Sequence, residues 1–263
     1  MKILIIGFGN MGQTYASSFT SSGFVNSSDI FVLNRSEVEK KKRFSIDKSN
    51  FYTEPSPVIF DVDIIILAVK PQDFSSLAVS ITPFVTKNHI LLSVMAGISI
   101  QTIQEKLGSN KVVRSMPNIP TQIGQGMTVF CASSDIDRKD LFIVQNLINT
   151  TGKSMYVEKE VMINAATAVS GSGPAYVFYF MNAMVQAAIK LGFSSSEAEF
   201  LVGQTFSKEC GAGSTGCGYT KTGAVGFISS SPRDGCCADK EFMFLNIIII
   251  TSYFIFQGFW GFG

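Results

Sequence analysis

Short apolar runs alternate with amphipathic stretches along the first part of the chain. The apolar runs occupy residues 3–6, 30–33, 64–69 and 90–94, and they match strands that are buried on both faces of a sheet. Helix-like patterns follow them at residues 11–19, 36–43, 74–84 and 100–107. Strands separated by helices predict βαβ units, and therefore a parallel sheet with right-handed crossovers.

The pattern changes near residue 157. Before that point, further strand patterns lie at residues 111–116, 126–131 and 154–157, with a helix pattern at 135–149. Beyond it, helical patterns occupy residues 158–169, 175–191 and 194–208, and Ser194 with Glu197 matches a capping box. We therefore expect two domains, an α/β domain over residues 1–157 and an all-helical domain over residues 158–208.

The composition breaks again near residue 209. Residues 211–226 are rich in glycine without a helical or strand period, and residues 242–263 contain many phenylalanines and no charged side chain. Those last 22 residues (263 − 242 + 1) are long enough to span a membrane, but Asn246, Gln257 and the lack of a flanking basic cluster argue against it. Three origins fit the atypical tail over residues 209–263: a shifted reading frame or truncation, a terminal segment buried in an oligomer, or membrane contact. We favour the first.

Charge and cysteine content narrow the class of partner. The formal net charge is +1 and 16% of residues are charged, so no strong field attracts nucleic acid or an anionic membrane. The apolar run after Lys2 is too short for a signal peptide, and the five cysteines lack the spacing of a secreted disulfide scaffold or a zinc site. We expect a cytoplasmic protein with a small-molecule partner, no membrane association and no metal.

A glycine-rich turn follows the first strand. Gly7-Phe-Gly-Asn-Met-Gly12 satisfies G-x-G-x-x-G between an apolar strand and a helix, which is the context that this motif requires. Gly7 permits the tight turn, Gly9 leaves room for a pyrophosphate, and Gly12 lets the helix pack closely on the strand. The motif predicts a Rossmann-type dinucleotide-binding domain.

The end of the second strand indicates which dinucleotide is bound. An NAD site usually places a carboxylate there to bind the ribose 2′-hydroxyl, but this chain has Asn34-Arg35-Ser36. Arg35 suits a 2′-phosphate, and Asn34 and Ser36 offer hydrogen bonds. The residues favour NADPH, with NADH as the alternative.

Three later loops also contain candidate ligand-binding residues. Lys70 and Pro71 follow the strand at residues 64–69, where ligands of an open parallel sheet bind. Met95, Gly97 and Asn118 come after later strands, and Asn118 lies in a loop that two prolines stiffen. Ser170-Gly-Ser-Gly-Pro174 separates two helical patterns and could present N–H and hydroxyl donors to a carboxylate.

Candidates for proton transfer or nucleophilic attack are scarce. The one histidine, His89, precedes a strand and suits a structural role, and Arg114 is as compatible with a structural role as with a functional one. We find no nucleophile–base arrangement and assign no catalytic residue.

These motifs together resemble the pyrroline-5-carboxylate reductase family over about the first 206 residues. The resemblance rests on the glycine turn, Asn-Arg-Ser, Ala68-Val-Lys-Pro71, Met95-Ala-Gly97, Arg114-Ser-Met-Pro-Asn118 and, most specifically, Ala168-Val-Ser-Gly-Ser-Gly-Pro-Ala-Tyr176. It implies a Rossmann domain followed by a helical domain that dimerises, and reduction of 1-pyrroline-5-carboxylate to L-proline with NADPH in proline biosynthesis.

The resemblance also implies two groups of binding residues. Those expected to contact the cofactor are Gly7, Phe8, Gly9, Asn10, Met11, Gly12, Asn34, Arg35, Ser36, Ala68, Val69, Lys70 and Pro71. Those expected around nicotinamide and substrate are Met95, Gly97, Asn118, Ser170, Gly171, Ser172, Gly173, Pro174 and Ala175.

The tail departs from the family pattern. The family continues into a Ser-Pro-Gly-Gly-Thr-Thr motif that completes the substrate pocket, whereas here Ser231-Pro232 is followed by Arg233-Asp-Gly-Cys-Cys. Two alternatives to the full activity therefore stay open: a catalytically impaired NADPH-binding copy, and a related Rossmann dehydrogenase of the hydroxyacid type.

Overall fold

The computed structural model describes residues 1–36 and 46–209. Apart from Ser36, the helix expected at residues 36–43 lies outside the described residues, as does the tail beyond residue 209. The strands are β1 (Ile3–Ile6), β2 (Ile30–Leu33), β3 (Phe51–Tyr52), β4 (Ile64–Leu67), β5 (Ile90–Ser93), β6 (Val112–Met116), β7 (Gly126–Ala132) and β8 (Gly152–Tyr156). The α-helices are α1 (Asn10–Ser21), α2 (Phe74–Ile81), α3 (Ile100–Leu107), α4 (Arg138–Asn149), α5 (Val161–Ala166), α6 (Gly173–Lys190) and α7 (Ser195–Glu209).

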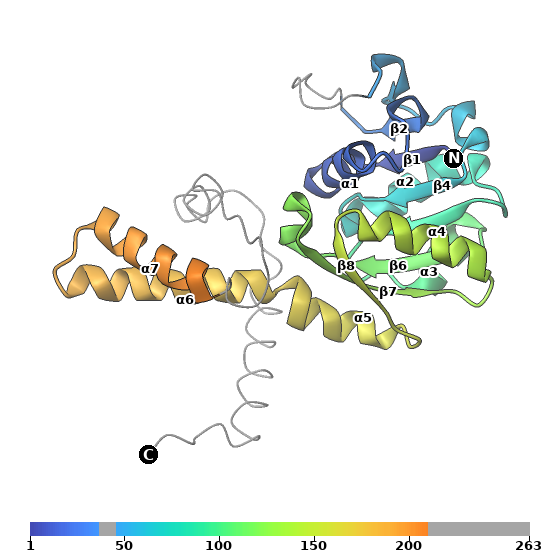
Figure 1. Ribbon diagram of the computed structural model, residues 1–263. Helices are drawn as coiled ribbons and strands as arrows, with labels where there is room; N and C mark the ends of the chain where they lie inside the picture. Colours follow the sequence, from blue (N-terminus) through green and yellow to red (C-terminus); the bar gives the residue numbers. More distant parts are fainter. Residues whose placement is uncertain (37–45, 210–263) are drawn as a thin grey trace. The chain divides into compact units, whose positions relative to one another are not determined.

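The strands form one sheet in the order β3-β2-β1-β4-β5-β6-β7-β8 (Figure 1). All neighbouring strands are parallel except β6 and β7, which are antiparallel. Strand β1 lies between β2 and β4, with Ile3 opposite both Ile30 and Ile64. The order of the strands reverses at β1, so ligands are expected beyond its carboxyl end.

Both faces of the sheet are covered, which explains why β1, β2 and β4 are apolar at every position. Ile3 and Ile5 point to one face and pack with side chains of α1 and α4, whereas Leu4 and Ile6 point to the other and pack with α2, α3 and α5. Residues of a strand alternate between faces, so a strand covered on both sides favours apolar residues at every position. This confirms the expected α/β fold with a Rossmann-type sheet.

Local capping sets the beginnings of α3 and α4. Helix α3 begins at Ile100 because the Ser99 hydroxyl accepts a hydrogen bond from the N–H of Thr102 (3.1 Å), and it ends at Gly108, whose φ is +67°. Helix α4 begins at Arg138, three residues later than expected, because the Asp137 carboxylate accepts from the N–H of Asp140 (2.8 Å).

The first compact unit extends from Met1 to Pro174 and therefore includes α5, which packs against β6 and β7. After α5 the chain continues through a π-helical turn, Thr167–Gly171, into α6. The sequence predicted a break between two helices here; the structure has a widened turn instead.

The second unit begins at Ala175 and contains the rest of α6 together with α7. The two helices pack through Val185, Ala188, Ala198 and Val202. The rings of Phe180 and Phe206 are arranged edge to face, with their centroids 5.9 Å apart. The expected capping box is present. The Glu197 carboxylate accepts from the N–H of Ser194 (2.9 Å), and the Ser194 hydroxyl accepts from the N–H of Glu197 (3.4 Å).

Candidate active site

The glycine turn after β1 has the geometry that its three glycines predict. Gly7 has φ +91°, and a Cβ there would lie 2.7 Å from the carbonyl oxygen of Ala68. A Cβ at Gly12 would collide with the carbonyl oxygen of Gly7, so glycine is needed for α1 to start this close to the strand. Gly9 differs, because a Cβ built on it meets no atom within 4 Å. The turn therefore packs tightly against the protein at Gly7 and Gly12, and it leaves free space for a ligand at Gly9.

Asn34 connects the end of β2 to the glycine turn. Its side-chain oxygen accepts from the N–H of Phe8 (3.0 Å), and its amide nitrogen donates to the carbonyl oxygen of Ser36 (2.8 Å). The N–H of Gly7 donates to the carbonyl oxygen of Leu33 (2.9 Å) beside it. The sequence suggested Asn34 as a hydrogen-bonding partner of the cofactor; in the structure it lines the candidate cofactor cavity, and its amide also bonds to the protein's own backbone.

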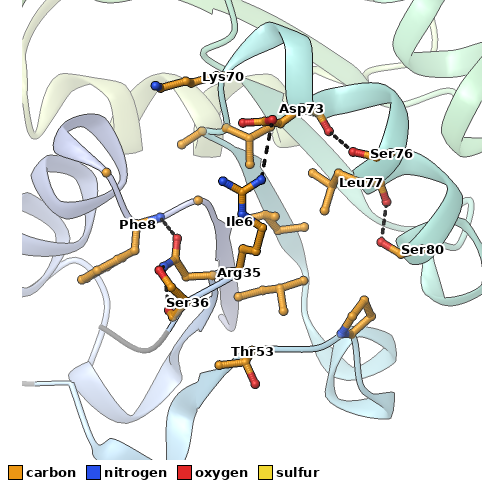
Figure 2. A pocket seen from close by; sticks show the side chains of 17 residues that line it. Ile6, Phe8, Arg35, Ser36, Thr53, Lys70, Asp73, Ser76, Leu77 and Ser80 are labelled. Carbon is orange, nitrogen blue, oxygen red and sulfur yellow. Dashed lines mark hydrogen bonds and ion pairs between the residues drawn. The ribbon is translucent and has the colours of Figure 1, made fainter. Parts of the chain in front are cut away.

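A cavity of about 440 Å³ lies beyond the carboxyl ends of β1, β2 and β4 (Figure 2). It brings together nine of the residues expected at the cofactor: Gly7, Phe8, Gly9, Asn34, Arg35, Ser36, Ala68, Val69 and Lys70. Asn10, Met11, Gly12 and Pro71 do not line it; the first three begin α1, and Pro71 begins the turn before α2.

The other wall of the cavity comes from residues that sequence reasoning missed. These are Thr53 and Pro55 after β3, and Asp73, Ser76, Leu77 and Ser80 of the segment that follows Lys70. Asp73, Ser76 and Ser80 recur three and four residues apart, which is the spacing of one helix face. This spacing comes directly after β4, whose carboxyl end lies at the edge of the sheet where ligands are expected. It was the sequence signal that could have identified these residues.

Two cationic residues are among those that line this cavity. The Arg35 side chain is 91% exposed, and its guanidinium lies 3.9 Å from the carboxylate of Asp73. Lys70 lines the same cavity from the end of β4 (Figure 2). An exposed guanidinium beside the open glycine turn is suited to a phosphate, because it offers parallel N–H donors and a permanent charge.

The second group of expected residues lies along β5, β6 and the start of α6. Met95 is buried, Gly97 has φ +76°, and a Cβ at Gly97 would meet nothing within 4 Å. Asn118 is fixed by the N–H of Met127, which donates to its side-chain oxygen (2.9 Å), while its amide nitrogen lies 3.5 Å from the hydroxyl of Ser170. The fold thus brings Asn118 and Ser170, 52 residues apart, within hydrogen-bonding reach.

The π-helical turn fixes the position of Ser170. Gly171 lies against Met116, since a Cβ there would be 2.7 Å from its methyl carbon. The N–H of Ser172 donates to the carbonyl oxygen of Thr167 (2.8 Å), so it is not among the donors that a substrate could use. Gly173 and Pro174 then form the first turn of α6, where proline is well tolerated, and Ala175 begins the second unit.

A buried ion pair attaches α5 to the sheet. Arg114 on β6, whose side chain is 5% exposed, donates to the carboxylate of Glu160 (2.8 Å) and to the side-chain oxygen of Asn164 (3.0 Å). The same carboxylate oxygen accepts from the N–H of Ile100 at the start of α3 (2.8 Å). Of the two roles considered for Arg114, the structure supports the structural one.

Three buried side chains have pKa values that are shifted mainly by burial. Burial raises the pKa of the Tyr15 phenol and raises the pKa of the Cys131 thiol to about 11. Burial also lowers the pKa of His89, whose ring nitrogen Nδ1 accepts from the N–H of Thr86 (3.0 Å). Within residues 1–36 and 46–209, no three His, Cys, Asp or Glu side chains are grouped so that they could hold a metal.

The reversal of strand order at β1, the glycine turn and the adjacent cavity define a dinucleotide-binding protein of the Rossmann type. Family models agree: one described as "NADP oxidoreductase coenzyme F420-dependent" matches residues 2–97, and one described as "Pyrroline-5-carboxylate reductase dimerisation" matches residues 160–214.

Relatives and solved structures give the family. The chain is 36% identical over 213 residues to pyrroline-5-carboxylate reductase 2 of Bacillus subtilis (strain 168), covering 78% of this chain and 73% of that protein. It is 32% identical over 201 residues to the reductase of Staphylococcus aureus (strain COL), covering 76% and 74%. The Plasmodium falciparum pyrroline carboxylate reductase with NADP bound superimposes with a TM-score of 0.71 at 25% identity, covering 98% of this chain and 93% of that one. The Coxiella burnetii enzyme gives 0.70 at 26%, covering 97% and 92%. This chain belongs to the pyrroline-5-carboxylate reductase family.

Proposed function

We propose that this protein reduces 1-pyrroline-5-carboxylate to L-proline with NADPH, in proline biosynthesis. The observation that carries the proposal is one cavity that combines the open glycine turn at Gly9 with the guanidinium of Arg35. The Bacillus subtilis and Staphylococcus aureus relatives carry the name of this activity, and the Plasmodium falciparum neighbour holds NADP.

The described residues fit the cofactor. Gly9 leaves room for a diphosphate next to the backbone, and the start of α1 supplies N–H groups and the positive end of a helix dipole. Arg35 and Lys70 line the cavity and would supply positive charge to a 2′-phosphate, and the end of β2 carries no carboxylate. NADPH is therefore the preferred cofactor and NADH the alternative. When bound, the reduced nicotinamide supplies the hydride.

Asn118 and Ser170 are the residues we assign to the substrate. The amide of Asn118 is held in one orientation by Met127, and the hydroxyl of Ser170 lies beside it. Together they offer neutral hydrogen-bond donors to a small carboxylate or imine, and Gly97 leaves space on the side of β5. Their task is to orient the substrate, because hydride transfer to a cyclic imine requires no protein nucleophile.

The helices after residue 157 are assigned to assembly. Helices α6 and α7 expose large apolar side chains, which include Val177, Tyr179, Phe180, Phe200 and Leu201. Large apolar side chains exposed in this number on two packed helices are expected to be covered in an interface. We propose a homodimer or higher homo-oligomer, with cofactor binding in residues 1–157 and dimerisation from residue 158 onward.

The location of the protein is part of the same proposal. Within residues 1–36 and 46–209, the structure contains no helix with the length and apolarity needed to cross a membrane. A reductase that uses NADPH and a small amino-acid precursor suits the cytoplasm, which is where we place it.

The test is an assay of the full chain with 1-pyrroline-5-carboxylate and NADPH, followed by the loss of nicotinamide absorbance. Gly9→Ala is the matched variant. Its Cβ has open space in the protein and its backbone is extended (φ −75°, ψ −162°), so the fold is preserved while the approach of the diphosphate is blocked. We expect turnover by the wild type and at least a tenfold weaker affinity for NADPH in the variant. Tight NADPH binding without turnover would overturn the reductase proposal and favour an impaired copy.

A further inference from the structure

We propose that Asp73 is a specificity-determining residue that weakens the preference of this site for NADPH over NADH. The inference rests on the proposed cofactor site and deepens it. Asp73 lies on the turn between β4 and α2 and shares its cavity with Arg35 (Figure 2). Among the described residues that line this cavity, Asp73 is the one carboxylate.

The position of Asp73 is well defined by its backbone. Its N–H donates to the carbonyl oxygen of Lys70 (2.9 Å), and its carbonyl oxygen accepts from the hydroxyl of Ser76 (3.0 Å). Asp73 directly precedes α2, where aspartate commonly caps a helix through its carboxylate. In the described part of the chain its carboxylate makes no such capping bond. The charge is therefore directed at the cavity and at Arg35 rather than at the helix.

The pair between Asp73 and Arg35 is weak. The nearest nitrogen–oxygen distance is 3.9 Å, and the side chains are 42% and 91% exposed. Exposed ion pairs with such long contacts contribute little to stability. A bound phosphate can therefore replace Asp73 as the partner of the guanidinium at a small cost in free energy. The orientation that Asp73 gives to Arg35 thus has a minor effect on cofactor affinity.

The direct effect on the phosphate is larger. A phosphate monoester carries a charge between about −1.5 and −2 near neutral pH, and a guanidinium that contacts it holds it within several ångströms of Asp73. Repulsion between these like charges, screened by water and salt, is expected to weaken NADPH binding about threefold to tenfold. Arg35 and Lys70 together outweigh one carboxylate, so the site still favours NADPH.

NADH meets the opposite situation. It carries a 2′-hydroxyl in place of the phosphate, and a carboxylate is the strongest acceptor for a hydroxyl donor. Dinucleotide sites usually place a carboxylate for the ribose 2′-hydroxyl at the end of β2. Here Asp73 supplies such a carboxylate from the turn before α2. The Asp73 carboxylate therefore weakens the binding of NADPH and strengthens the binding of NADH.

The test measures the dissociation constants of NADPH and NADH for the full chain, by nicotinamide fluorescence without substrate. Asp73→Asn removes the charge and keeps the size of the side chain; Asp73→Ser serves as a second variant, and circular dichroism confirms folding. Asp61→Asn is the matched control, because it makes the same charge change at an exposed residue before β4, at the other end of that strand.

We expect Asp73→Asn to raise the ratio Kd(NADH)/Kd(NADPH) about threefold to tenfold, mainly through tighter NADPH binding, with a smaller effect at high salt. Asp61→Asn should leave the ratio within about twofold. If both nucleotides bind the wild type and the Asp73 variants leave the ratio unchanged or lower it, the role of Asp73 is refuted and the cofactor site stands. A wild type that binds neither nucleotide overturns both proposals.

Discussion

The ion pair between Arg114 and Glu160 gives the sharpest prediction about stability. Glu160→Ala removes the carboxylate that accepts from the Arg114 guanidinium and from the N–H of Ile100, both at 2.8 Å. Arg114 is 4% exposed, so the variant leaves a buried guanidinium, and the acceptor that remains to it on α5 is the neutral side-chain oxygen of Asn164.

The cost follows from the burial of the two partners. Breaking a fully buried pair by removing one partner costs about 3–5 kcal/mol, because the other charge is left uncompensated. Glu160 is 31% exposed, so water reaches part of the site and the cost is reduced. We expect the free energy of unfolding to fall by about 2–4 kcal/mol.

Urea denaturation of the full chain, followed by circular dichroism at neutral pH, measures this change. Glu158→Ala is the control, since Glu158 is exposed and precedes the same helix; it should shift stability by no more than about 0.5 kcal/mol. A second variant, Arg114→Met with Glu160→Ala, removes both charges and should recover part of the loss. Equal stabilities of Glu160→Ala and Glu158→Ala would show that the pair does not hold α5 on the sheet.

Three further predictions concern the turn, the buried histidine and the substrate residues. Gly12→Ala should destabilise the chain by about 1–3 kcal/mol and abolish NADPH binding, because its Cβ collides with the Gly7 carbonyl; wild-type stability in urea would contradict this. Burial lowers the pKa of His89, so the unfolded chain takes up a proton first and stability is lost as pH falls below 6.5. His89 is the one histidine in the sequence, so His89→Asn should flatten the stability profile between about pH 7 and pH 6, and an unchanged slope would refute its role. Ser170→Ala removes the hydroxyl beside Asn118 and should raise KM for 1-pyrroline-5-carboxylate about threefold to tenfold at unchanged NADPH affinity; an unchanged KM would remove Ser170 from the substrate site.

The buried sheet could be predicted from the sequence because its strands are covered on both faces. The runs at residues 3–6 and 30–33 coincide with β1 and β2, and residues 100–107 coincide with α3, whose ends are marked by Ser99 and Gly108. The glycine turn was equally readable, because its three glycines have the fixed spacing of a dinucleotide-binding motif between a strand and a helix.

What could not be predicted depends on contacts between distant segments. The short strand β3, Phe51–Tyr52, exists because it pairs with Val32 and Leu33, and two residues carry no periodicity of their own. The hydrogen bond from Phe8 to Asn34 and the ion pair of Arg114 with Glu160 join residues 26 and 46 positions apart. No local pattern distinguishes such side chains from ligand-binding ones.

The double attachment of Asn34 also limits how the cofactor preference of this scaffold could be redesigned. The obvious substitution toward NADH use, an acid at the end of β2, would be Asn34→Asp. That change keeps an acceptor for the N–H of Phe8 but removes the amide donor to Ser36, so it would loosen the loop that leads out of the strand. Redesign should therefore keep Asn34 and vary the side chains at positions 35 and 73. These side chains are exposed, and their mutual contact is a long, weak ion pair.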